Sequence, residues 1–314
     1  MFQVAGLVLP LFGLVFLGYI AGRIKKIPLE GLAWLNFFLI YIALPALFFT
    51  LLAETPVSEF ANGAFLFNTT LGTLLIFILS FSIAKFLTRA AIPSATVQGF
   101  AGAYGNIGYM GPPLAIAAFG PEAGVPVALV FCLDNAMHFI LAPTLMAIAD
   151  KQPKSAVGVV GGILKKILTH PFILATIAGV AAAGFQYRPP EPIYQLLEAV
   201  SGAAAPCALF AMGVTAALRP LARIPLELGY LIPIKLLIHP LLMYLLLSRL
   251  PGLNPVWIHV AVLMAALPSA TNVFVIAQQY QVWEQRASSA VILSTLLSVV
   301  TITGYLYMAT NGII

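Results

Sequence analysis

Residues 105–113 read Gly-Asn-Ile-Gly-Tyr-Met-Gly-Pro-Pro, and they interrupt an apolar stretch, residues 95–118, that is long enough to cross a membrane. Three glycines and two prolines among nine residues cannot continue a regular helix, because glycine disfavours it and proline lacks the required N–H group. Backbone groups freed at membrane depth must face protein or a water-filled cavity. The stretch therefore predicts a membrane helix that is broken at a polar site.

The composition of the chain places this broken helix in an integral membrane protein. Apolar residues make up 61% of the 314 residues and charged residues only 8%, whereas soluble domains carry about 25% charged residues. So few charges cannot cover a water-exposed surface. The composition therefore excludes a soluble enzyme, a nucleic-acid-binding protein and a disordered protein. We expect a lipid bilayer around the chain, no nucleic-acid partner and no separate soluble domain.

The apolar stretches predict an all-α membrane protein with ten transmembrane helices. Each stretch is a continuous apolar run of the length that a spanning helix needs, and none shows the alternation of a membrane barrel. The ten stretches are residues 3–22, 32–52, 63–86, 95–118, 123–148, 165–184, 193–217, 226–248, 256–280 and 286–310.

The basic residues predict the orientation of these spans. Twelve of the fifteen fall in connections on one side, two fall on the other side, and Lys235 falls within a span. The positive-inside rule makes the first side cytoplasmic. We therefore expect a multi-pass protein of the cytoplasmic (inner) membrane with both termini outside. The twelve residues are Arg23, Lys25, Lys26, Lys85, Arg89, Lys151, Lys154, Lys165, Lys166, Arg219, Arg223 and Arg286.

A shift of the sequence by 161 residues indicates an internal repeat. Three prolines and three further residues meet identical residues in one register, without a gap. A unit of five spans has an odd number of crossings, so its copy must be inverted, as in many secondary transporters. We predict a first repeat at residues 1–155 and a second at residues 156–314. The matched residues are Pro10/Pro171, Pro28/Pro189, Pro45/Pro206, Gly18/Gly179, Glu30/Glu191 and Phe49/Phe210.

The ninth stretch carries an interruption, residues 267–272, that corresponds to the one in the fourth. Paired broken helices indicate a transporter site at the membrane midplane, where half-helix N-termini direct free N–H groups at an anion. The alternative is that these polar residues only satisfy the broken backbone. The predicted substrate-binding residues are Asn106, Tyr109, Pro112, Pro113, Pro268, Ser269, Thr271 and Asn272.

Three ionisable residues inside predicted spans are candidates for coupling. Asp134 and His138 share one face of the fifth span, and Lys235 lies in the eighth. Ionisable groups within a membrane are costly and are functional candidates for that reason. Asp134 could carry a proton, bind a cation or pair with Lys235, and Lys235 could instead extend to the interface. The alternative for all three is a structural polar network.

The sequence resembles the auxin efflux carrier family of membrane transporters, which includes plant PIN-FORMED exporters and bacterial organic-acid carriers. The resemblance rests on motifs in the second, fourth, seventh and ninth stretches and extends over essentially the whole chain. The motifs are Leu44-Pro45-Ala46, Asn106…Met110-Gly111…Pro113, Ala205-Pro206 and Leu267-Pro268…Phe274-Val275…Ala277…Tyr280.

The resemblance implies a fold similar to that of bile-acid sodium symporters, with crossing broken helices four and nine. It implies a scaffold of helices 1, 2, 6 and 7 and a moving transport domain of helices 3–5 and 8–10. It also implies a homodimer formed through the scaffold.

We therefore expect a secondary active transporter that moves a small organic anion, such as a carboxylate, by elevator-like alternating access. We expect no enzymatic activity, no metal and no cofactor, with proton or sodium coupling left open. The alternatives are a sodium-coupled organic anion symporter of the bile-acid type and, in another class, a channel or receptor. A membrane enzyme is disfavoured, because the sequence shows no nucleophile–base pair, metal cluster or phosphate loop.

Overall fold

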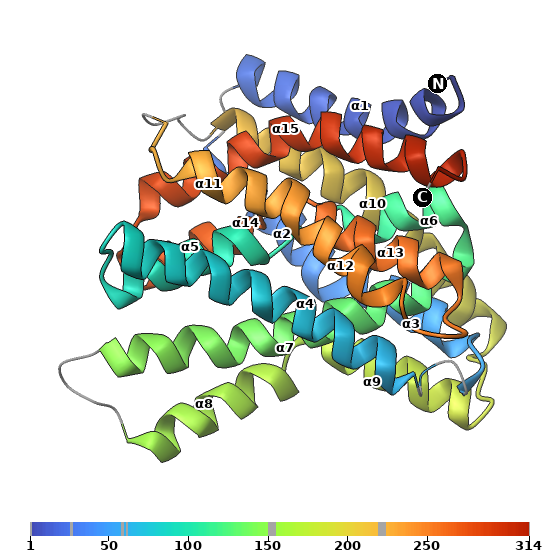
Figure 1. The fold of residues 1–314 in the computed structure, drawn as a ribbon. Coiled ribbons are helices and arrows are strands. Elements are labelled where there is room, and N and C mark those ends of the chain that lie inside the picture. The colour runs from blue at the N-terminus through green and yellow to red at the C-terminus, as the bar shows by residue number, and fades with distance from the viewer. Residues whose placement is uncertain are drawn as a thin grey trace.

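The computed structural model describes residues 2–25, 28–57, 60, 62–149, 155–218 and 224–313. These residues form one bundle of helices without a strand, with α1 and α15 along one face and α8 at the opposite edge (Figure 1). Short 3₁₀ or π turns, labelled η, interrupt or extend several helices. The first repeat predicted above holds α1 (Phe2–Lys25), η1 (Leu29–Leu32), α2 (Ala33–Phe38), η2 (Leu39–Ala43), α3 (Leu44–Ala53), α4 (Gly63–Ser82), η4 (Ile83–Leu87), α5 (Ile92–Ala103), α6 (Gly111–Phe119), η5 (Pro121–Ala123) and α7 (Gly124–Ala149).

The remaining elements continue the same all-helical bundle. Pro233 leads into a π turn, η6, which displaces the helix axis at the position of Lys235. The second predicted repeat holds α8 (Ala156–Leu168), α9 (Pro171–Gly184), α10 (Glu191–Leu218), α11 (Leu228–Pro233), η6 (Ile234–Ile238), α12 (His239–Leu247), α13 (Pro255–Ala266), α14 (Thr271–Gln279) and α15 (Glu284–Thr310).

The exposed and buried side chains are distributed as in a membrane protein. Large apolar side chains such as Phe16, Trp34 and Leu241 are exposed on the outside of the bundle, whereas Asp134 and Lys235 are buried inside it. Six helical segments of the described chain are long and apolar enough to cross a membrane, and α9 and α13 are shorter apolar helices. The expected all-α membrane class is confirmed. The six segments are Glu30–Ala53, Gly63–Leu87, Pro121–Ala149, Glu191–Leu218, Leu228–Leu247 and Glu284–Thr310.

The sixth predicted span, residues 165–184, is wrong as a single helix. The chain forms α8, breaks at Thr169–His170 and begins again as α9. Pro171 explains the break, because proline disfavours the helical conformation of the residue before it, and His170 is extended. Several basic residues on which the orientation rests lie outside the described residues, namely Lys26, Lys151, Lys154, Arg219 and Arg223.

Glycines bring two pairs of helices into backbone contact. A methyl group on Gly18 of α1 would collide with the carbonyl oxygen of Phe210 on α10, and one on Gly213 of α10 would collide with that of Val15 on α1. Gly179 of α9 packs in the same way on α3, since its added Cβ would lie 3.1 Å from the Phe49 carbonyl oxygen. Small residues at such crossings let membrane helices approach closely.

Replacing Gly213 by alanine should destabilise the protein by about 1–3 kcal/mol, because the new methyl group meets the backbone of α1, which cannot move as a side chain could. The matched control is Gly202→Ala on the same helix, where nothing lies within 4 Å. The control should be neutral or stabilising, because alanine favours helix. Thermal unfolding of the purified variants in detergent measures both effects, and equal unfolding midpoints would contradict the prediction.

Candidate functional site

Two helices break at the positions where the sequence places glycine and proline. The chain leaves α5 after Ala103 and enters α6 at Gly111, where Pro112 and Pro113 occupy the first helical turn. It leaves α13 after Ala266 and enters α14 at Thr271. Leu267 is extended, as expected of a residue before proline. Both breaks are therefore local consequences of sequence.

The two broken segments cross and bond to each other. Gly105 and Ser269 form an antiparallel bridge. The Asn106 N–H donates to the Pro268 carbonyl at 2.8 Å, and the Ala270 N–H donates to the Tyr104 carbonyl at 2.8 Å. Each break thus satisfies backbone groups that the other leaves without a helical partner, as a membrane interior requires. We call residues 104–106 and 268–270 the crossover.

Gly105 is needed for this close approach. A Cβ atom at this position would lie 3.0 Å from the Met264 carbonyl oxygen and 3.3 Å from Lys235 Nζ. Any larger side chain would push α13 and η6 away. The glycine also leaves only backbone between the crossover and the lysine ammonium group.

Two cavities open beside the crossover. The larger, about 470 Å³, is lined mainly by residues of α2, α10 and α14, and the smaller, about 70 Å³, by residues that include the crossover, α7 and α9. Four side chains line both cavities, so the two spaces are adjacent. These shared residues are Ile40 of η2, Tyr109, Thr271 and Asn272.

The structure divides the predicted binding residues into two groups. Those that line one or both cavities are Asn106, Tyr109, Thr271 and Asn272. Those that line neither are Pro112, Pro113, Pro268 and Ser269. The residues of the second group shape the backbone or bond to it. The prolines begin or precede helices, and the Ser269 hydroxyl donates to the Ala101 carbonyl at 2.6 Å.

The two predicted asparagines have amide groups available for a ligand. Asn106 Nδ2 contacts only the Met212 sulfur, at 3.0 Å, and a thioether is a weak acceptor. Asn272 Nδ2 donates to the Tyr104 hydroxyl at 3.0 Å. Asn106 lines the smaller cavity from the crossover and Asn272 lines both cavities from the first turn of α14, so a ligand oxygen could replace or join these partners.

Sequence reasoning missed two residues that organise this site, Tyr104 and Asn135. The Tyr104 hydroxyl accepts from Asn272 and donates to Asn135 Oδ1 at 2.5 Å, and Asn135 Nδ2 donates to the Phe131 carbonyl at 2.7 Å. Tyr104 directly precedes the glycine that begins the break, and Asn135 adjoins Asp134. Those positions were the available signals.

Replacing Tyr104 by phenylalanine should destabilise the protein by about 1–3 kcal/mol, because Asn135 and Asn272 both lose a buried hydrogen-bond partner. The matched control is Tyr194→Phe, which removes an exposed hydroxyl that donates to Glu54 and should cost less. Unfolding midpoints in detergent compare the two variants. A control that is as damaging as Tyr104→Phe would contradict the structural role.

Neither cavity is lined by a lysine or an arginine; His170 lines the smaller cavity and Glu30 the larger one. Positive potential comes instead from the first turn of α14, whose initial N–H groups lack helical acceptors. The start of α6 contributes less, since Pro112 and Pro113 have no N–H. The site thus suits an anion held by amides and backbone dipoles.

The predicted coupling residues lie buried behind the crossover. Asp134 Oδ2 accepts from the Thr73 hydroxyl at 3.3 Å, and Lys235 Nζ donates to the Ala265 carbonyl at 2.6 Å. Extension of Lys235 to the interface is therefore wrong. Asp134 and Lys235 interact electrostatically, although the close ion pair within the described ranges is the one that joins Glu227 to Arg286.

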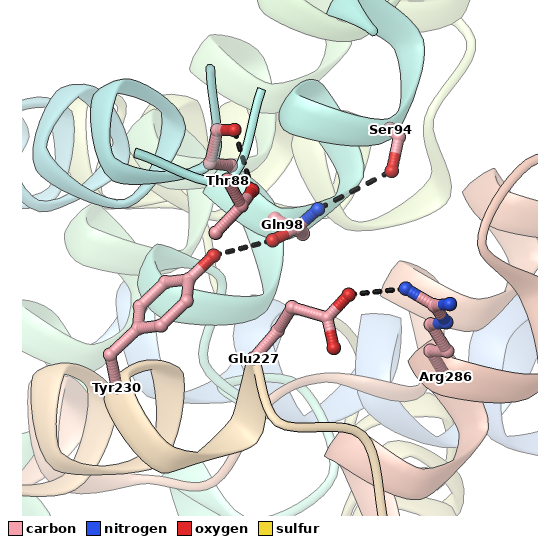
Figure 2. Close-up of polar contacts among 7 residues, drawn as sticks. Thr88, Ser94, Gln98, Glu227, Tyr230 and Arg286 are labelled. Atoms are coloured by element: carbon pink, nitrogen blue, oxygen red, sulfur yellow. Dashed lines mark hydrogen bonds and ion pairs between the residues drawn. The ribbon is translucent and has the colours of Figure 1, made fainter. Parts of the chain in front are cut away.

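A polar cluster ties together helix ends away from the crossover. Figure 2 shows Tyr230 of α11 donating to Gln98 of α5, which in turn donates to Ser94 at 3.3 Å. Beside them Glu227 pairs with Arg286 of α15. The cluster therefore links α5, α11 and α15.

Comparisons with known proteins agree with this architecture. Residues 3–306 match the family described as "Membrane transport protein". The chain is 54% identical over 312 residues to a Rhizobium meliloti (strain 1021) protein named "Putative malonate transporter", covering 99% of this chain and 98% of that one. It is 28% identical to an "Uncharacterized transporter" of Methanothermobacter thermautotrophicus, covering 94% and 95%.

A plant relative connects the chain to the family suggested by its sequence motifs. "Probable auxin efflux carrier component 1b" of Oryza sativa subsp. japonica is 28% identical over 153 residues, which are 46% of this chain and 27% of the plant protein. The resemblance to auxin efflux carriers is confirmed. The chain therefore belongs to the membrane transport protein family, and it is a multi-pass membrane transporter and not an enzyme.

Proposed function

We propose that this protein is a secondary active transporter of a small carboxylate, with malonate as the first candidate substrate. The observation that carries the proposal is the pair of cavities beside the crossover, which Asn106 and Asn272 line and no lysine or arginine does. Amide donors and the start of α14 suit a carboxylate. The relative named as a malonate transporter supports this substrate class.

We further propose ten spans in two inverted repeats, with both termini outside the cytoplasmic membrane. The glycine contacts support this arrangement. Gly18 packs on Phe210, and Gly179 packs on Phe49. Under the shift of 161 residues Gly18 corresponds to Gly179 and Phe49 corresponds to Phe210, so the two contacts are counterparts of each other. A two-fold relation between the halves requires this reciprocity.

The crossover supports the same relation with a shift of 164. Gly105 pairs with Ser269, its own counterpart under that shift. Under this shift Asn106 corresponds to Ala270, and Pro268 corresponds to Tyr104. The hydrogen bond from the Asn106 N–H to the Pro268 carbonyl therefore has the bond from the Ala270 N–H to the Tyr104 carbonyl as its counterpart. The ten spans are then α1, η1–α3, α4–η4, α5–α6, η5–α7, α8–α9, α10, α11–α12, α13–α14 and α15.

Elevator-like movement is the proposed mechanism. The scaffold would consist of α1, η1–α3, α8–α9 and α10, a part suited to form a homodimer as in the family that the sequence resembles. The transport domain would carry the crossover and the remaining helices. The polar cluster of Figure 2 supports this division, because its residues all belong to transport-domain helices and to the segment leading into α11.

Uptake of radiolabelled malonate into proteoliposomes tests the function. Wild type should show saturable uptake that unlabelled malonate inhibits. Inhibition by unlabelled acetate and succinate then shows which lengths of carboxylate the site accepts. Currents that rise linearly with voltage and do not saturate would instead indicate a channel. Absence of malonate uptake and exchange would overturn the proposed substrate.

A disulfide between the two parts tests the sliding movement. Cys132 on α7 of the transport domain donates to the Thr176 hydroxyl on α9 of the scaffold at 3.2 Å. In a Cys207→Ser background, Thr176→Cys places two sulfur atoms in bonding range. Oxidation should abolish malonate transport, and a reducing agent should restore it.

The control for this experiment is Thr176→Ser in the same background, which cannot crosslink and should transport before and after oxidation. Mass spectrometry establishes that the crosslink has formed. Full transport by a completely crosslinked protein would contradict movement between α7 and α9.

A further inference from the structure

Four titratable side chains are buried together behind the crossover, on the side away from the larger cavity. Asp134 and His138 come from α7, Lys235 from η6 and His239 from α12, and each is at most 4% exposed. Several of their polar atoms have no hydrogen-bond partner: Asp134 Oδ1, both ring nitrogens of His138 and His239 Nε2. A purely structural network would be expected to satisfy these atoms.

Lys235 occupies a position that suits a cation. Its ammonium group donates to the carbonyl of Ala265, in the last turn of α13, where the helix leaves carbonyl oxygens unpaired and its dipole is negative. Carbonyls freed at such half-helix ends bind coupling ions in secondary transporters. Here the lysine supplies the positive charge from within the protein.

His239 adds no charge to this group. Its Nδ1 lies 3.1 Å from Lys235 Nζ, and an ammonium group only donates, so Nδ1 must accept and the ring is neutral. His138 stacks on Tyr104 with ring centroids 3.8 Å apart. The remaining partner from α4 is the uncharged Thr73 hydroxyl.

Asp134 is the acidic group of the cluster, and one of its oxygens is free to take a proton. Oδ2 accepts from Thr73, while the buried Oδ1 has no partner. Asp134 and Lys235 interact electrostatically without the direct contact of an ion pair. When no anion is bound, the negative charge of an ionised Asp134 and the positive charge of Lys235 cancel.

Binding of an anion changes this balance. Gly105 lines the smaller cavity, and Lys235 Nζ lies 3.3 Å from the position of a Cβ on that glycine. A carboxylate at the crossover would therefore compete with Asp134 for one nearby positive charge in a region of low dielectric constant. Protonation of Asp134 would leave the bound anion and Lys235 as a balanced pair.

We propose that Asp134 is the proton-coupling site of this transporter, and that one proton binds to its carboxylate whenever an anion binds at the crossover. The proton comes from water on the side where the anion enters, forms an O–H bond at Oδ1 and returns to water on the other side. No electron transfer is involved. This inference rests on the proposed transport of anions at the crossover.

The experiment measures malonate in proteoliposomes in two ways. Exchange of internal for external malonate needs no net driving force and tests the proposed function alone. Net accumulation tests coupling: an inward gradient of one pH unit should raise accumulation by about 10-fold for one proton carried. An inward sodium gradient at equal pH should have no effect.

The decisive variant is Asp134→Asn, which resembles the protonated carboxyl. Its exchange should no longer depend on pH, and its accumulation driven by a pH gradient should be lost. Asp134→Glu retains a titratable carboxyl and should recover part of that accumulation. The matched control is Thr144→Val on the same helix, where the hydroxyl donates only to the Ile140 carbonyl, and it should behave as wild type.

The outcomes separate the two proposals. Proton coupling is overturned if the wild type exchanges malonate but a pH gradient drives no accumulation, whether or not a sodium gradient does. The proposed transport function would still stand in that case. Accumulation by Asp134→Asn in a pH gradient overturns the assignment of the site. Wild type that does not exchange malonate overturns the proposed function, and this inference with it.

Discussion

Replacement of both Asn106 and Asn272 by alanine should abolish malonate transport at concentrations that saturate the wild type. Each amide offers a hydrogen bond to a charged oxygen, which contributes about 1.5–3 kcal/mol, so that losing both weakens binding on the order of 10²- to 10⁴-fold. A ligand-induced shift of the unfolding temperature measures the affinity, and proteoliposome uptake measures the consequence. Each single variant should show an intermediate loss.

The control for this prediction is Asn68→Ala on α4. Asn68 is remote from the cavities, and its side chain donates only to the Ala64 carbonyl at the surface. Asn106 has a sulfur atom as its only side-chain partner, so its removal should barely change stability. Equal transport by the wild type and the double variant would refute the assignment of the two asparagines to the site.

Replacement of Lys235 by methionine should destabilise the protein by about 3–5 kcal/mol, because Asp134 then lies buried without a compensating positive charge. The Ala265 carbonyl also loses its donor. Methionine keeps much of the volume of the lysine side chain, so packing loss contributes little. Unfolding of the purified protein in detergent with increasing denaturant measures the change.

A second variant separates charge from packing. Asp134→Asn/Lys235→Met removes both charges and should recover most of the stability lost in Lys235→Met. If the two residues were independent, the stability change of the double variant would instead equal the sum of the two single changes. Lys165→Met on α8 removes an exposed lysine and should be close to neutral. A double variant that is less stable than Lys235→Met alone would contradict the charge balance.

The sequence predicted the breaks because glycine and proline act on the backbone locally. Gly105, Gly108 and Pro112 disfavour a helix most strongly where they cluster, and the same reasoning located the break at Pro268. The break before Pro171 was missed although the same rule applies there, because the apolar residues on both sides were interpreted as one span.

The polar partners could not be predicted in the same way. The contacts of Lys235 with Ala265 and of Tyr104 with Asn135 join residues about thirty positions apart on different helices. Such pairs depend on how helices pack, which composition and periodicity do not specify. For Ser269 the direction of one hydroxyl decided between a ligand contact and a backbone contact, and the sequence carries no information on that direction.

The reciprocal bonds of the crossover have a consequence for biogenesis. The partners of Tyr104 and Asn106 belong to residues 268–270, which the ribosome makes more than 160 residues later. Until residues 268–270 enter the membrane, the Tyr104 carbonyl and the Asn106 N–H lack these partners, and each unsatisfied group in lipid costs several kcal/mol. The segment that holds residues 104–106 therefore cannot complete its backbone hydrogen bonds until the second half of the chain has been inserted.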